Sequence, residues 1–476
     1  VKDPFFSIWS ACDKLNEDDV EFWTGLKRKI YGVVHADGTA YTFMGRRLCG
    51  KNMTQKSVKL TAFTTEYEFT CDAFDLTVSF VSPLLPDDLT VLSNPVCYMT
   101  YTLKPKTELK DVKVMLVVGD EICYDKVAMP IHGGVMTLPQ GQTSWFGLKK
   151  QLLMSQSSDS SAAEWGHWYL TGQKAAITDD AGVIDLYESG VVHNRSGAKK
   201  YIVAYNGYDS VTTAIKGKFT LAFDDVLSIE YFGDYLKGYY FRNGATIYDA
   251  IADAWNSYDI IMKKLADFDE DLQTKTKAYG EDYLTVLYAG LRQSIAAHKL
   301  VADREGNVLF LSKECHSNGC IATVDVSYPS IPLYLLYNPE LVKGLIRPIF
   351  KFADMPVWTY DFAPHDVGTY PHCCGQIYAY TERNHADDEK VEAGDTMFIN
   401  CNNDRQGNEF DVPYTYPMIY NMPNPNGKMY GFKWQMPVEE CGNMLIMVAA
   451  TIAADGDLTL AKKNFKTLKT WVKYLK

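Results

Sequence analysis

The sequence has no long apolar run and no block of basic residues, and each absence excludes a class of protein. No apolar run approaches the ~18 residues that a helix needs to span a bilayer. The longest, around residues 445–454, has the pattern of a buried helix. Lys and Arg are nowhere clustered and the net charge is −12, which would repel phosphate groups. Neither a membrane span nor a nucleic-acid partner is therefore expected.

The eleven cysteines form no C-x-x-C pair and no Cys/His spacing typical of zinc. Most are expected to be small buried thiols. Cys315 and Cys320 bracket a Ser-Asn-Gly turn and could form a local disulfide. The cysteines do not show whether the protein lies in an oxidising or a reducing compartment. The chain starts at Val1 without a signal-like segment, so any leader is expected to have been removed.

Several catalytic motifs are also absent. The sequence contains no G-x-S-x-G, no H-E-x-x-H and no P-loop. Its one S-x-x-K, from Ser196 to Lys199, lies between predicted strands without companion motifs, which disfavours a serine amidase. Residues 400–411, "NCNNDRQGNEFD", resemble a calcium loop only faintly, because the terminal Glu of an EF-hand is missing. We therefore expect no metal and no cofactor.

The first half of the chain has the alternation of β-strands. In "AFDLTVSF", Phe74, Leu76, Val78 and Phe80 alternate with the polar Asp75, Thr77 and Ser79, which is typical of a half-buried strand. Asp37-Gly38 separates two β-rich runs, which is a strong hairpin signal. At 476 residues the chain should have two or more domains. Many short strands, with no helical period before about residue 245, predict an antiparallel β-sandwich over residues 1–240.

After residue 245 the apolar period becomes helical. A helix is predicted behind a Thr246 cap with Asp249 at its third position, and a second one reaches His298. Asn338 and Pro339 form another helix start. The last predicted helix runs to the end of the chain without a glycine stop. The helical domain, 241–476, is therefore expected to be incomplete.

Long irregular segments at 303–330, 355–375 and 385–436 separate the predicted helices. Such long loops in a compact domain are usually functional. Three loop-to-helix junctions carry candidate side chains: Asp325 and Tyr328, then Asp361, His365 and Asp366, and finally Glu439 and Glu440. Hydrolysis needs such groups, one to donate a proton to the leaving group and another to activate water or attack directly.

Each candidate has an alternative structural role. An acidic residue in a first helical turn complements the helix dipole, which could account for one of Glu439 and Glu440. Asp366 could be an Asx-turn or a cap, because Gly368 follows it closely. Asp361 and His365 have no routine packing role in such a loop, and for them a functional site is favoured.

Four segments resemble the glutaminase A family, which includes secreted fungal glutaminases. They are "DPFFSIWSACDKLNEDDVEFWTG", "SKECHSNGCIATVDVSYPSIPLYLLYNPEL", "DFAPHDVGTYP" and "MPVEECGNML" followed by "DGDLTLAKKNF". They occur in the family's order and the resemblance spans nearly the whole chain. It implies a β-sandwich followed by a six-hairpin (α/α) toroid, of which this chain lacks part.

The resemblance also implies a function: hydrolysis of L-glutamine to glutamate and ammonia by a secreted or periplasmic enzyme. The carboxylates would lie at the mouth of the toroid, with Trp358, Tyr370 and Trp434 near the substrate. The same arrangement would suit an exo-glycosidase. A third possible function is that of a non-catalytic carbohydrate-binding protein. The expected partner is a small molecule, glutamine or a sugar, and the sequence does not indicate an oligomeric state.

Overall fold

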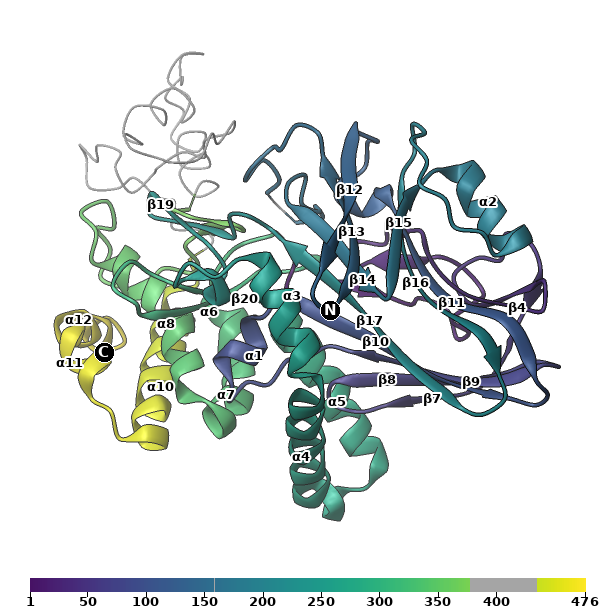
Figure 1. Cartoon of the computed structure of the whole chain (residues 1–476). Helices are drawn as coiled ribbons and strands as arrows, with labels where there is room; N and C mark the ends of the chain where they lie inside the picture. The colour runs from purple at the N-terminus through teal and green to yellow at the C-terminus, as the bar shows by residue number, and fades with distance from the viewer. Residues whose placement is uncertain (158, 377–434) are drawn as a thin grey trace.

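The structure is a computed structural model and describes residues 1–157, 159–376 and 435–476. Strands fill the first half and helices predominate in the second. Figure 1 shows the strand-rich part on the right and the helices up to the C-terminus on the left, with α3, α4 and α5 between them. The predicted order of a β domain followed by a helical domain is confirmed.

Two large sheets form the β-sandwich. The eight-stranded sheet has the order β12 (Ile131–Leu138), β13 (Gly141–Leu148), β14 (His167–Gly172), β17 (Ile215–Asp224), β10 (Val96–Pro105), β9 (Phe74–Val81), β8 (Thr64–Thr70) and β7 (Thr54–Leu60). The six-stranded sheet has the order β15 (Lys174–Thr178), β16 (Tyr201–Val211), β11 (Leu109–Gly119), β4 (Ile30–Ala36), β5 (Thr39–Met44) and β6 (Lys51–Asn52). Within these sheets every pair is antiparallel except β5 with β6.

Local sequence signals explain these strands. In β9 the side chains of Phe74, Leu76 and Val78 are buried, and Asp75 between the first two is exposed. Asp37 and Gly38 have φ values of 48° and 73°, the left-handed conformation that a two-residue hairpin between β4 and β5 requires. Both predicted features are confirmed.

Two short helices in the first half were missed by the sequence analysis, which found no helical period there. These are α1 (Leu89–Ser93) and α2 (Asp180–Ser189). Asp179 caps α2 by accepting from the Gly182 N–H, and Gly190 ends it in the left-handed conformation. Capping residues were thus the available signal, because a helix of three turns shows little periodicity.

The second half contains α3 (Ile247–Asn256), α4 (Tyr258–Thr276), α5 (Glu281–Ala296), α6 (Val324–Ser327), α7 (Ile331–Tyr337), α8 (Pro339–Ala353), α10 (Pro437–Asp455), α11 (Thr459–Lys463) and α12 (Phe465–Tyr474). The predicted caps are present: Thr246 and Asp249 form a capping box at α3, and Asn338 accepts from Glu340 N at α8.

Three smaller sheets complete the fold. They consist of β1 (Ile8–Trp9), β2 (Val20–Phe22) and β3 (Lys27–Arg28); of β19 (Asp234–Leu236), β18 (Ile229–Tyr231), β23 (His372–Cys373) and β22 (Gly368–Thr369); and of the hairpin β20 (His298–Ala302) and β21 (Val308–Ser312). This hairpin corrects the prediction that a helix reaches His298. That helix, α5, ends at Ala296, and the ring of His298 stacks on Phe310 from the next strand.

Buried polar contacts join the two halves. Lys299 of β20 lies 2.7 Å from both Asp3 and Asp225. Arg292 of α5 donates to the backbone oxygens of residues 61 and 62, between β7 and β8, and of residue 64, where β8 begins. These contacts fix α5 and β20 of the helical half against the sandwich.

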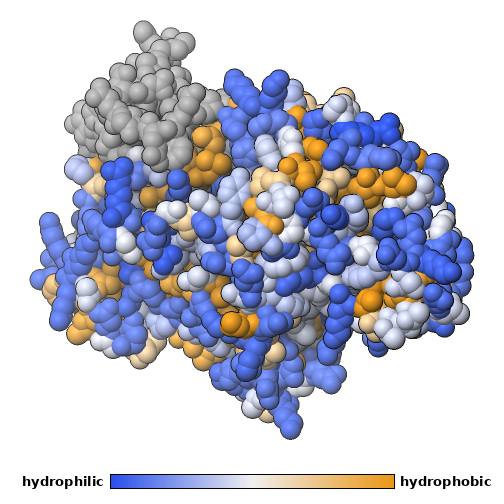
Figure 2. Space-filling view, in the orientation of Figure 1, coloured by the Kyte–Doolittle hydropathy of each residue, from blue (hydrophilic) through white to orange (hydrophobic). Residues whose placement is uncertain are grey.

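The surface seen in Figure 2 is mostly hydrophilic, and its apolar groups form separate patches among polar ones. Within the described ranges, no helix is both long and apolar enough to cross a membrane.

Candidate functional site

Three of the predicted site residues come together in space. Asp325, His365 and Glu440 each offer one ligand-type atom, and these atoms lie within 4.8 Å of one another. The three side chains come from α6, from the loop before β22 and from the first turn of α10. They are separated by up to 115 residues in sequence, so the fold itself creates the cluster.

Backbone hydrogen bonds place the first two residues side by side. The Val324 N–H donates to the His365 carbonyl at 2.9 Å, and the Val367 N–H donates to the Ile321 carbonyl at 3.1 Å. The segment that leads into α6 therefore runs along the loop that carries His365. Asp325 is the second residue of α6, so this pairing brings its carboxylate to the imidazole.

His365 is held by a buried carboxylate. Its Nδ1 lies 2.8 Å from Asp366 Oδ2, and the other oxygen of Asp366 accepts from the Gly368 N–H at 2.9 Å. Burial lowers the pKa of His365, but the hydrogen bond and charge of Asp366, with Glu440 and Asp325 nearby, outweigh it and raise the pKa to about 9. At neutral pH the ring is therefore a cation, and its Nε2 faces the other two carboxyl groups.

Glu440 is fully buried, and neither of its oxygens has a hydrogen-bond partner within the described part of the chain. Burial raises the pKa of this carboxyl group to about 9, against the opposing effect of His365. A buried unpaired carboxylate is costly, so at neutral pH Glu440 is in its neutral, proton-bearing form. It is thus an acid that can donate a proton.

Asp325 is the open member of the cluster. About 29% of its side chain is exposed, and its Oδ1 lies 3.7 Å from His365 Nε2. That oxygen has no hydrogen-bond partner among the residues described. Oδ1 is itself buried, so water reaches Asp325 through the exposed remainder of its side chain. A carboxylate that water can reach is suited to accept a proton from it.

The same three atoms also fit a divalent cation. One imidazole nitrogen and two carboxylate oxygens are common ligands, and a second carboxylate on the far nitrogen of the histidine, here Asp366, is the usual support for such a ring. The fit in spacing is loose, since the separations extend to 4.8 Å. The sequence analysis expected no metal, and that remains a prediction.

Other predicted residues lie outside this cluster. Asp361 and Glu439 are exposed. Trp358 is buried and its indole donates to the Phe362 carbonyl, and Tyr370 is buried with its ring 5.3 Å from that of Phe5. Tyr328 is half-buried at the end of α6. Trp434 and the weak calcium-type segment 400–411 lie outside the described residues. The roles assigned to these side chains stay predictions.

The suggested disulfide between Cys315 and Cys320 is not formed, because both are free thiols. Cys315 Sγ instead donates to the Lys313 carbonyl at 3.5 Å. Cys320 lies against Asp366, whose charge adds to burial in raising the pKa of this thiol. The turn between them is held by the Asn318 side chain, which accepts from the Cys320 N–H.

Sequence reasoning missed two glutamines beside the cluster. Gln376 Nε2 donates to the Asp366 carbonyl at 3.1 Å and to Gln435 Oε1 at 3.1 Å, and Gln435 Nε2 donates back to Gln376 Oε1 at 2.6 Å. Both side chains are fully buried. They lie 59 positions apart in sequence, so no local pattern points to their pairing.

Three family models match consecutive parts of the chain. The model described as the glutaminase A six helical-hairpin domain matches residues 280–411 and 395–476. Two models described as domains of unknown function match residues 64–275 and 1–53. Glutaminase A of Aspergillus oryzae is 24% identical over 519 residues, which cover 100% of this chain. Together these matches support membership of the chain in the glutaminase A family.

A second relative, a probable glutaminase of Arthroderma benhamiae, is 23% identical over 503 residues and matches 94% of the chain. The chain spans only 65% and 51% of the lengths of these two relatives. A solved structure named as a kojibiose phosphorylase from the human microbiome is similar with a TM-score of 0.37 at 10% identity, over 71% of this chain and 41% of that one. The domain limits 1–240 and 241–476 remain a prediction.

Proposed function

We propose that this chain carries the reacting centre of an exported hydrolase that converts L-glutamine to glutamate and ammonia. The observation that supports this most strongly is the fully buried, unpartnered Glu440 beside a cationic His365. The buried, neutral Glu440 holds a proton that it can transfer to a departing nitrogen, and an amine leaving group needs such a proton donor. The names of the two fungal relatives support the choice of glutamine.

Each side chain has a role that follows from its environment. Asp325 accepts a proton from water as the water oxygen attacks the side-chain amide carbon. His365 donates a hydrogen bond from Nε2 to the carbonyl oxygen, which gains negative charge. Glu440 then transfers its proton to the nitrogen as the C–N bond breaks, and ammonia leaves. Asp366 holds the imidazole in place and stabilises its charge.

A glycosidase is the second candidate, and the spacing of the carboxyl groups bears on it. Oxygens of Asp325 and Glu440 lie within 4.8 Å. Retaining glycosidases have their carboxyl groups about 5–5.5 Å apart, whereas inverting enzymes need ~6.5–9.5 Å to fit a water. A sugar substrate would therefore be cleaved with retention, Asp325 being the nucleophile.

The test is an assay of the full-length protein, because the longer relatives extend beyond this chain. Ammonia release from L-glutamine would be followed beside a panel of aryl glycosides and oligosaccharides. We expect glutamine turnover that falls at least 100-fold in Glu440→Gln, since a positioned acid contributes about 10²–10⁴. Sugar release without ammonia would overturn the glutaminase assignment. Binding of sugars without any turnover would favour the non-catalytic alternative.

The proposed export of the protein from the cytoplasm is tested separately from its activity. Expressed in its native host, the protein is expected in the periplasm or the medium, and fractionation with a cytoplasmic marker enzyme would check this. Recovery with the cytoplasmic marker would contradict export without affecting the catalytic assignment.

A further inference from the structure

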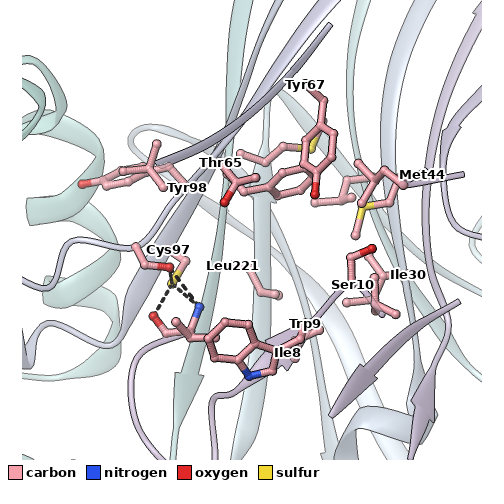
Figure 3. A pocket seen from close by; sticks show the side chains of 18 of the residues that line it. Ile8, Trp9, Ser10, Ile30, Met44, Thr65, Tyr67, Cys97, Tyr98 and Leu221 are labelled. Carbon is pink, nitrogen blue, oxygen red and sulfur yellow. Dashed lines mark hydrogen bonds between the residues drawn. The ribbon is translucent and has the colours of Figure 1, made fainter. Parts of the chain in front are cut away.

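We propose that the β-sandwich binds an uncharged aromatic molecule bearing a single hydroxyl group. The site is a cavity of about 320 Å³ enclosed by strands of both large sheets and by the segment around β1. Figure 3 shows its lining side chains converging from several strands. None of the lining residues belongs to the cluster of Asp325, His365 and Glu440, so this is a separate site.

The walls of the cavity are mainly apolar. Tyr67 and Leu221 come from the eight-stranded sheet, Ile30 and Met44 from the six-stranded one, and Trp9 closes one side. For comparison, an engineered apolar cavity of ~150 Å³ stays dry and binds benzene. The cavity here is about twice as large and has similar walls. Its lining atoms lack van der Waals contacts on the side of the cavity, and a bound apolar ring would supply those contacts.

Ionic ligands do not fit this cavity. No carboxylate lines it, and Arg292 is the one side chain of its lining that carries a charge. The guanidinium is already engaged: it donates to the carbonyls of Thr61, Ala62 and Thr64 and to Thr65 Oγ1. The Val1 nitrogen donates to Ser82 Oγ. A charged ligand such as glutamine would lose its hydration without finding a partner.

One polar group remains available. The Tyr67 hydroxyl has no hydrogen bond to any described residue, and Figure 3 shows it directed between Thr65 and Ser10. The other four hydroxyls of the lining each have a partner. Thr65 Oγ1 accepts from Arg292 and Ser10 Oγ donates to the Cys12 carbonyl. Ser82 Oγ accepts from the Val1 nitrogen, and the Tyr98 hydroxyl donates to the Ala254 carbonyl. An apolar pocket with a single free hydroxyl favours a mostly apolar ligand with one matching polar group.

The cavity is reachable from the surface. Ser10 is exposed, and Ile8 and Trp9 are half-buried. The mouth therefore lies at the segment that follows β1. Trp9 lines the cavity directly, so its fluorescence should report occupancy.

The experiment compares 1-naphthol with naphthalene on the full-length protein. We expect saturable binding of both, seen by Trp fluorescence and by a rise in Tm, with 1-naphthol the tighter by about 2- to 10-fold for one net hydrogen bond. Tyr67→Phe should abolish the difference between the two compounds while keeping naphthalene binding. Leu221→Trp should fill the cavity and abolish binding of both.

Several outcomes would overturn the proposal. No binding of either probe by the wild-type protein, or wild-type binding by Leu221→Trp, excludes the cavity as a ligand site. An unchanged preference for 1-naphthol in Tyr67→Phe excludes the hydroxyl as the recognition group. If Leu221→Trp does not fold, Ser10→Trp at the mouth replaces it. Ammonia release should be the same in every variant, which separates this proposal from the glutaminase assignment.

Discussion

His365 Nδ1 lies 2.8 Å from Oδ2 of the adjacent, fully buried Asp366. The second oxygen of Asp366 accepts from the Gly368 N–H at 2.9 Å, which helps to fix the loop conformation in which these neighbours face each other. The carboxylate therefore both orients the ring and stabilises its charge, and Nε2 on the other side of the ring faces Asp325, 3.7 Å from its Oδ1.

Replacing Asp366 with Asn should shift the pH profile of the enzyme. The cationic form of His365 persists up to a pKa of about 9 in the native protein. Activity that needs this form is present at neutral pH and is lost as the pH rises through about 9. Without the Asp366 charge the pKa falls, so activity should be lost at a lower pH and kcat at pH 8 should fall by at least tenfold. Initial rates from pH 5 to 10 measure this.

Asp361→Asn is the matched control for Asp366→Asn, because that carboxylate is exposed and lies five residues upstream. Its pH profile should follow the wild type. A profile that shifts in Asp361→Asn and stays unchanged in Asp366→Asn would assign the supporting role to Asp361.

Glu440 should make stability fall as the pH rises. Burial raises its pKa to about 9, well above its ordinary value of 4.5. A raised pKa contributes stability that is fully present below the unfolded-state pKa and is lost as the pH climbs through the folded-state pKa. Glu440→Gln removes this effect, so its stability relative to the wild type should grow between pH 5 and 9, by on the order of a few kcal/mol.

Urea unfolding of Glu440→Gln and wild type at several pH values would measure that difference. Glu439→Gln is the paired control, since Glu439 is exposed one position earlier. It should change the pH dependence little. A constant difference between Glu440→Gln and wild type across this pH range would show that Glu440 is ionised throughout.

The fold could be predicted from local patterns, whereas the site required long-range information. The capping box at Thr246 and the hairpin at Asp37 are encoded in a few adjacent residues, and both are present. Glu439 and Glu440 were equivalent in sequence, because the helical rotation that buries one and exposes the other depends on what α10 packs against. Trp358 and Tyr370 are expected near the substrate from the family resemblance, and both side chains are buried in the structure, so their role stays a prediction.

The pair of Gln376 and Gln435 should hold His365 and Asp366 in position. Gln376 binds the Asp366 carbonyl, and Gln435 Oε1 accepts from the His365 N–H at 3.5 Å. Gln376→Leu leaves buried polar groups of Gln435 unsatisfied, which typically costs about 1–3 kcal/mol. We expect kcat to fall about tenfold with little change in KM, because the substrate contacts themselves remain.

Gln376→Glu is the rescue variant. At a pH below the pKa of the new carboxyl group, kcat should be restored in part, because a protonated carboxyl can still donate a hydrogen bond. An equal loss of kcat in both variants with an unchanged pH profile would indicate a purely structural role.

Chelation distinguishes proton transfer from metal catalysis at the cluster. If Glu440 acts as a neutral acid, dialysis against EDTA should leave ammonia release unchanged. A loss of activity that Zn²⁺ or Mn²⁺ restores would instead make Asp325, His365 and Glu440 metal ligands. Metal content measured before and after dialysis, and in Asp325→Asn, decides between the two independently of activity.

Lys299 should be among the most sensitive positions for stability, because it is buried and lies between two carboxylates. Its Nζ is 2.7 Å from Asp3 Oδ2 and 2.7 Å from Asp225 Oδ2, and these charges raise the pKa of the ammonium group. Lys299→Met leaves two buried carboxylates without their cation, and breaking such a group typically costs about 3–5 kcal/mol. The N-terminal segment, the sandwich and β20 meet at this point, so unfolding should also become less cooperative.

Lys264→Met is the control. Lys264 binds Asp88 at 2.6 Å, but nearly half of its side chain is exposed, and an exposed pair contributes about 0–1 kcal/mol. Urea unfolding of both variants measures the contrast, and equal losses would mean that burial does not strengthen the role of Lys299.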